Sequence, residues 1–166
     1  STACPRADAT GWARHRREPG AVILGYPDDP TVTAGGSLVL RVSTDAPAFC
    51  VVVHRCGAEV EPVAVTGWLP GEPAPRGAPH EAWDWPGHVI EVPASWRPGV
   101  YLAVLVEGDG GALPAVGAAV PYAPTGQALF VVRAAGARAP VLYKLPLFTW
   151  HAYNTVLPAD GWSLYN

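Results

Sequence analysis

Hydrophobic and more polar residues alternate along several short segments of the chain. In residues 37–44, Leu38, Leu40 and Val42 alternate with a set that includes Arg41. This two-residue period is typical of a half-buried β-strand. In a second segment, residues 99–107, the residues at 100, 102, 104 and 106 alternate with Tyr101, Ala103 and Leu105 and are typical of a strand. No segment of ten or more residues has the 3.6-residue period of an amphipathic helix. The pattern therefore predicts an all-β protein.

Turn residues separate these segments at intervals of roughly 8–12 residues, which is the spacing expected of strands in a sandwich. The 18 glycines and 19 prolines of the 166-residue chain mark the turns, among them residues 27–30, 34–36 and 108–111, the last of which is expected to be a hairpin turn. Strands are expected at 21–25, 37–44, 49–55, 59–65, 88–92, 99–107, 115–120 and 127–133. Their number and spacing predict an immunoglobulin-like antiparallel β-sandwich over residues 21–134.

The two ends of the chain differ from this central part. Residues 1–20 lack periodicity and are expected to form an N-terminal arm. Residues 140–148 are almost continuously apolar, as in a strand covered on both faces, so we expect residues 135–166 to form a linker and the opening of a second, truncated domain. Aromatic side chains exposed to water would form an apolar patch that promotes association. The aromatic tail 140–166 is therefore expected to contact the sandwich, the remainder of this second domain or a second copy of the chain.

Charge and cysteine content narrow the function classes. The net charge is −3 and 15% of the residues are charged, which argues against a nucleic-acid partner because phosphate contacts need a basic face. No apolar run approaches about 18 residues, so no membrane-spanning helix is expected. Cys50 and Cys56 lie roughly 20 Å apart along one strand and cannot pair, although Cys4 could reach either one. Free thiols suit a reducing, cytoplasmic location.

Tryptophans and histidines provide the candidate binding residues. An aromatic face can hold a sugar ring, so a carbohydrate- or small-ligand-binding module is one hypothesis; the other is that the indoles cover one end of the sandwich with each N–H hydrogen-bonded. The tryptophans concerned lie in loop 68–96 and are Trp68, Trp83, Trp85 and Trp96. A metal could use His80, Asp84 and His88, although their spacing matches no recurring site. No nucleophile elbow or phosphate-binding loop is present, so the residues alone identify no complete active site.

Two motifs carry a resemblance to a known family. Residues 93–103 read Pro-x-x-Trp-x-x-Gly-Val-Tyr-Leu-Ala, and residues 149–154 read Thr-Trp-x-Ala-Tyr-Asn. With weaker matches at 25–44, 130–133 and 162–165, these segments resemble the N-terminal portion of the large (beta) subunit of N,N-dimethylformamidase-like proteins. The resemblance covers most of residues 22–166. One departure from the family pattern is Asp160-Gly161, where the family usually has paired glycines.

The resemblance implies a β-sandwich that precedes an α/β catalytic domain of glutamine-amidotransferase-like shape, whose first strand the tail resembles. It also implies that the parent protein hydrolyses an amide C–N bond with one iron held by two tyrosinates and a glutamate. Tyr153 is the candidate for one of these tyrosinates and Tyr165 a weaker one, the alternative for Tyr153 being a buried tyrosine at a strand end. The chain itself is expected to be a non-catalytic accessory region, without a cofactor of its own and inactive alone.

Overall fold

The computed structural model describes residues 23–75, 83–117 and 126–134, together with the single positions 136, 144 and 146. All regular secondary structure in these residues is β, and no helix in them could span a membrane. The strands are β1 (Leu24–Pro27), β2 (Thr31–Thr33), β3 (Ser37–Ser43), β4 (Ala48–Cys56), β5 (Val60–Val65), β6 (Leu69–Pro70), β7 (Gly87–Glu91), β8 (Gly99–Gly108) and β9 (Gln127–Arg133).

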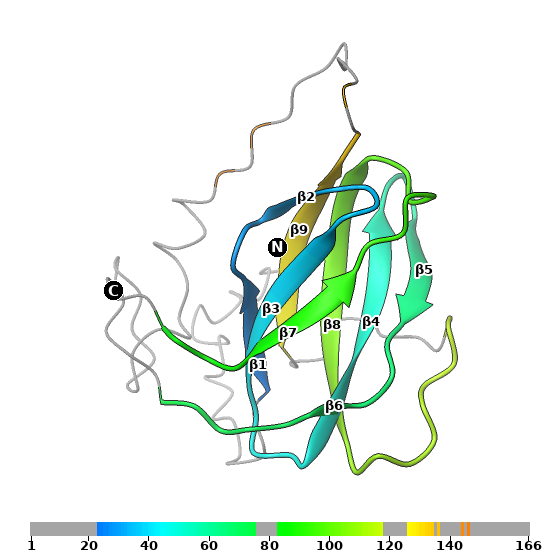
Figure 1. The fold of residues 1–166 in the computed structure, drawn as a ribbon. Helices are drawn as coiled ribbons and strands as arrows, with labels where there is room; N and C mark the ends of the chain where they lie inside the picture. The colour runs from blue at the N-terminus through cyan, green and yellow to red at the C-terminus, as the bar shows by residue number, and fades with distance from the viewer. Residues whose placement is uncertain are drawn as a thin grey trace, which may run out of the picture.

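The strands form two sheets that lie face to face (Figure 1). The smaller sheet has the order β1-β3-β7 and is antiparallel. The larger sheet has the order β2-β9-β8-β4-β5, and β6 pairs with the start of β4. Its strands are antiparallel except for β2, which runs parallel to β9. This arrangement confirms the predicted β-sandwich.

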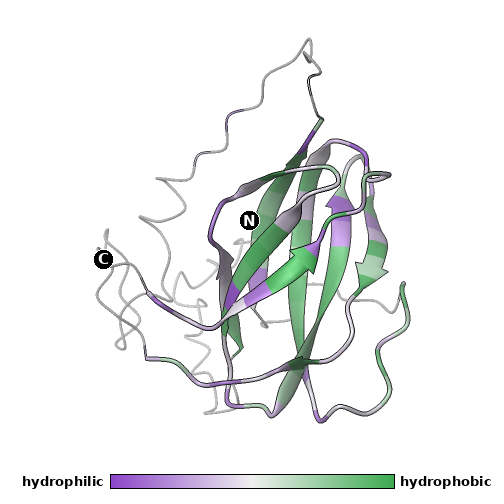
Figure 2. Ribbon diagram, in the orientation of Figure 1, coloured by the Kyte–Doolittle hydropathy of each residue, from purple (hydrophilic) through white to green (hydrophobic). Residues whose placement is uncertain are grey.

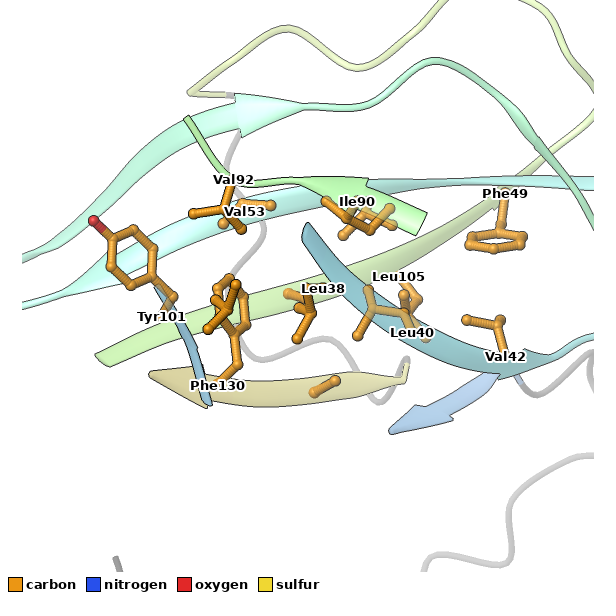
Figure 3. Close-up of a cluster of buried hydrophobic side chains, with 14 of the residues drawn as sticks. Leu38, Leu40, Val42, Phe49, Val53, Ile90, Val92, Tyr101, Leu105 and Phe130 are labelled. Carbon is orange, nitrogen blue, oxygen red and sulfur yellow. The ribbon is translucent and has the colours of Figure 1, made fainter. Parts of the chain in front are cut away.

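Alternate side chains from the two sheets fill the space between them. Leu38, Leu40 and Val42 of β3 are 2%, 1% and 1% exposed, as their two-residue period predicts. Figure 3 shows these side chains beside Phe49 of β4 and Leu105 of β8. The core cluster also contains Val51, Val53, Ile90, Val92, Tyr101, Ala103, Ala128, Phe130 and Val132.

Several predicted elements differ from those observed. The strand expected at 21–25 is observed at Leu24–Pro27, and the short strands β2 and β6 were not expected, because two or three residues cannot show an alternation. A strand was expected at 115–120, but residues 115–117 are not in a strand and 118–120 lie outside the described residues. Gly117 has a φ of 96°, which an extended strand cannot contain. The turn at 108–111 was expected to join a hairpin, whereas the connection from β8 to β9 runs from residue 109 to residue 126.

The domain boundaries at residues 20 and 134 stay a prediction. The arm 1–20 lies outside the described residues, and so does most of 135–166.

Replacing Phe130 by Ala tests the importance of the core. Phe130 is 1% exposed and stacks on Tyr101 with ring centroids 5.5 Å apart, so its loss should lower the free energy of unfolding by about 3–5 kcal/mol. Chemical denaturation measures this change. Val89→Ala is the control, because Val89 is 60% exposed on the smaller sheet, and it should change stability by no more than about 0.5 kcal/mol. Equal effects of the two substitutions would contradict the assignment of the core.

Candidate functional site

The aromatic residues at 83–85 pack against β1. The ring centroids of Trp83 and Trp85 lie 5.1 Å apart, and that of Trp85 lies 5.5 Å from Tyr26. The Tyr26 hydroxyl donates a hydrogen bond to the carbonyl oxygen of Trp83. Trp85 is 2% exposed, and its indole N–H donates to the carbonyl oxygen of Pro75 at 2.8 Å. Trp85 is therefore an anchor inside the fold, whereas Trp83 is half-buried.

Arg41 of β3 ties the same segment to the turn after β1. Its guanidinium donates to both carboxylate oxygens of Asp28, at 2.8 and 3.1 Å. It also donates to a carboxylate oxygen of Asp84 at 3.0 Å and to the carbonyl oxygen of Trp85 at 2.8 Å. The paired position on β7 is Gly87, where an added Cβ would lie 3.7 Å from the guanidinium carbon of Arg41. At that distance a methyl group would be in ordinary van der Waals contact with the guanidinium, so the network itself does not require glycine at this position.

The charges of this network shift the pKa values of its members. The hydrogen bond to Asp28 raises the pKa of Arg41 above its ordinary value. Burial raises the pKa of Tyr26, although the positive charge of Arg41 acts in the opposite direction. The Tyr26 phenol is therefore neutral at physiological pH and is available as a hydrogen-bond donor rather than as an anionic ligand.

Trp68 covers the end of β8. An added Cβ at Gly108 would lie only 2.1 Å from the Cη2 atom of the Trp68 ring, so glycine is required for this close approach. The indole N–H of Trp68 donates to the carbonyl oxygen of Gly111 at 2.7 Å. Trp68 therefore holds the turn after β8 against the sheet.

Trp96 belongs to another aromatic group. Its ring stacks on Tyr101 with centroids 5.0 Å apart and an interplanar angle of 6°. Tyr101 in turn stacks on Phe130, and its hydroxyl donates to the carbonyl oxygen of Arg97 at 2.6 Å. This stack closes one part of the core.

The structure thus distributes the four predicted binding tryptophans over three local groups. In the described parts of the chain, Trp83 and Trp85 are joined by a ring contact, whereas Trp68 and Trp96 make no ring contact with that pair. The indole N–H groups of Trp68 and Trp85 are bonded to backbone carbonyls, as the alternative packing hypothesis predicts. Carbohydrate binding itself stays a prediction.

The metal hypotheses have little support from the described residues. Asp84 binds Arg41, and the His88 ring packs edge-on against Phe49 with centroids 4.9 Å apart; His80 lies outside the described residues. Within the described ranges, no three His, Cys, Asp or Glu side chains are grouped closely enough to hold a metal ion. Tyr153 and Tyr165 also lie outside the described residues.

Sequence reasoning missed the Arg41 network, which depends on β1, β3 and residues 83–85 meeting in space. His54 of β4 is 5% exposed, as its apolar neighbours on the same strand predict. Among the described residues, its Nδ1 atom has no hydrogen-bond partner.

These features describe a β-sandwich in which most of the candidate aromatic residues serve packing. Comparison with known protein families identifies the family of this chain. Residues 57–166 match the family model of the N,N-dimethylformamidase beta subunit-like C-terminal domain. The chain therefore belongs to the N,N-dimethylformamidase beta subunit-like family. This confirms the resemblance, although the matching model describes the C-terminal part of the subunit and the sequence had suggested the N-terminal portion. No curated protein matches the chain.

Gly108→Ala tests the contact with Trp68. The added methyl group would overlap the indole ring, and overpacking of this kind costs about 1–3 kcal/mol in the free energy of unfolding. Gly67→Ala is the matched control, because an added Cβ there meets nothing within 4 Å. In a Trp68→Ala background the cost of Gly108→Ala should largely disappear. An unchanged cost in that background would contradict the proposed contact.

His88 should make stability depend on pH. Burial lowers its pKa, and the negative charge of Glu72 acts in the opposite direction. In the unfolded state the pKa of His88 is about 6.5, so the unfolded chain binds the proton more readily than the folded chain. The contribution of neutral His88 to the free energy of unfolding is therefore fully present above about pH 6.5 and is lost as the pH falls below it. Urea unfolding at several pH values between about 5 and 7.5 should show this loss for the native chain and a smaller loss for His88→Gln. Identical pH profiles would contradict the prediction.

Proposed function

We propose that this chain is the non-catalytic β-sandwich region of a dimethylformamidase-like amide hydrolase, where it supports the catalytic domain and subunit contacts. The observation that carries the proposal is the extent of the family match. The match begins at residue 57, directly after β4, and includes β5 to β9 as well as the tail to residue 166. Most of the sandwich and the tail are thus matched by a single family model. This supports a structural role for the sandwich within the larger protein.

We further infer that the sandwich is immunoglobulin-like. The orders β1-β3-β7 and β9-β8-β4-β5 correspond to strands A-B-E and G-F-C-C′ of that fold, with β2 added beside strand G. Tyr101, near the start of β8, donates its hydroxyl to the carbonyl oxygen of Arg97 four residues upstream, as in a tyrosine corner. Both the strand order and the Tyr101 hydrogen bond support an immunoglobulin-like fold.

In this proposal, residues 21–134 form the accessory sandwich and residues 135–166 open the catalytic domain. Tyr153 would supply one tyrosinate to an iron that the parent protein completes with other ligands, because one tyrosinate does not give a metal site its affinity. The described residues contain no fitting donor set, so no catalytic step is assigned to them. The free thiols of Cys50 and Cys56 support a reducing, cytoplasmic location.

Iron content and amide hydrolysis test the proposed function. The purified 166-residue chain should contain no stoichiometric iron and should not hydrolyse dimethylformamide or formamide. In a longer product of the same gene that binds iron, Tyr153→Phe should lower the iron content measured by elemental analysis. Tyr26→Phe is the control and should leave the iron content unchanged, because the Tyr26 hydroxyl bonds to the backbone of Trp83. Iron near one per chain together with turnover by the 166-residue chain would contradict the proposal.

A further inference from the structure

The outer face of the larger sheet is apolar. On β4 and β8, the side chains that alternate with the core residues point away from the smaller sheet. An antiparallel sheet with a solvated outer face would carry polar residues there. The alternation with the core residues places mostly apolar residues at the outer positions of β5, β4, β8 and β9. Figure 2 shows most of the length of β4, β8 and β9 in the colour of hydrophobic residues. The outer residues are Val60, Pro62 and Val65 of β5, Cys50, Val52, His54 and Cys56 of β4, Val100, Leu102, Val104 and Val106 of β8, and Leu129 and Val131 of β9, with the polar residues Gln127 and Arg133 at the two ends of β9.

The centre of this face is already covered. Cys50, Val52 and Val104 have 0% exposure, although Val52 and Val104 do not belong to the core cluster between the sheets. His54 is 5% exposed, and within the described parts of the chain its Nδ1 atom has no hydrogen-bond partner. A buried, unpaired ring nitrogen is costly unless a polar group approaches it. The face therefore has the properties of an interior surface.

In the half of the face formed by β8 and β9, two cross-strand pairs are only partly buried. Val100 pairs with Val131, and Leu102 pairs with Leu129. These four apolar side chains are each of intermediate exposure and adjoin the covered centre through the pair Leu102 and His54. This half of the face therefore has room for a further apolar segment.

We propose that residues 140–150 of the same chain dock on the β8–β9 half of this outer face. The chain continues directly from β9, which ends at Arg133 on the same sheet. Lys144 and Pro146 of this segment are exposed. If the segment is extended, the alternate positions Tyr143, Leu145 and Leu147 point to the opposite side and form an apolar stripe.

Two other parts of the chain fit this half of the face less well. The connection from β8 to β9 carries Leu113 and Val116, but these are 45% and 59% exposed and so point to solvent. The N-terminal arm 1–20 has Trp12 as its only large apolar residue. Besides Leu145 and Leu147, residues 141–150 contain five large apolar or aromatic residues, namely Val141, Leu142, Tyr143, Phe148 and Trp150.

Photo-crosslinking of the full 166-residue chain tests the docking. A benzophenone amino acid is introduced in place of Leu129, and in a second variant in place of Val131, so that a folding defect in one does not end the test. After irradiation, mass spectrometry of the digested monomer should find adducts within residues 140–150. Val89, which is 60% exposed on the smaller sheet, is the control position and should give no such adduct.

Substitutions in the tail complete the experiment. Leu145→Asp together with Leu147→Asp should remove most of the adduct, whereas Lys144→Glu should leave its yield unchanged. Adducts confined to residues 1–20 or 109–126, or found only between two copies of the chain, would overturn the proposal, and so would their absence in both folded variants. The crosslink reports the docking without reference to iron or turnover, so its failure would leave the proposed accessory function standing.

Discussion

The pairing of β4 with β8 is the constraint on which the rest of the structure depends. The two strands are in register from Ala48 opposite Gly108 to Cys56 opposite Val100. Because side chains alternate along each strand, this one register sends Phe49, Val51 and Val53 into the sandwich and their neighbours to the outer face. Both sets are apolar. The inner set creates the core that the smaller sheet covers, and the outer set requires a second cover that the nine described strands do not provide.

The margins of the sandwich are held by aromatic and charged residues. Trp68 fixes the turn after β8, Trp96 stacks on Tyr101, and the pair Trp83 and Trp85 is tied to β1 and β3 through Tyr26 and Arg41. Each group joins a loop to a sheet. These contacts fix the positions of the loops relative to the two sheets.

Alternation in the sequence was sufficient to predict β3 and β8, because each is long enough to show its period, and β4 and β9 were predicted as apolar segments between turns. It failed for β2, which depends on parallel pairing with β9, and for residues 115–117, where Gly117 has a positive φ. The four tryptophans were predicted together since they are close in sequence, yet their neighbours are set by tertiary contacts such as Gly108 beside Trp68. The Arg41 network joins residues 28, 41 and 84. These residues are far apart along the chain, so no local sequence pattern indicates that they meet.

The reactivity of Cys50 tests most directly that both faces of the β4–β8 pair are buried. This thiol lies on the outer face with 0% exposure, and burial raises its pKa. Alkylation in native buffer, followed by peptide mass spectrometry, should modify Cys50 only at the rate set by global unfolding. Modification of Cys50 as fast as in the denatured chain, with the fold intact, would contradict the account.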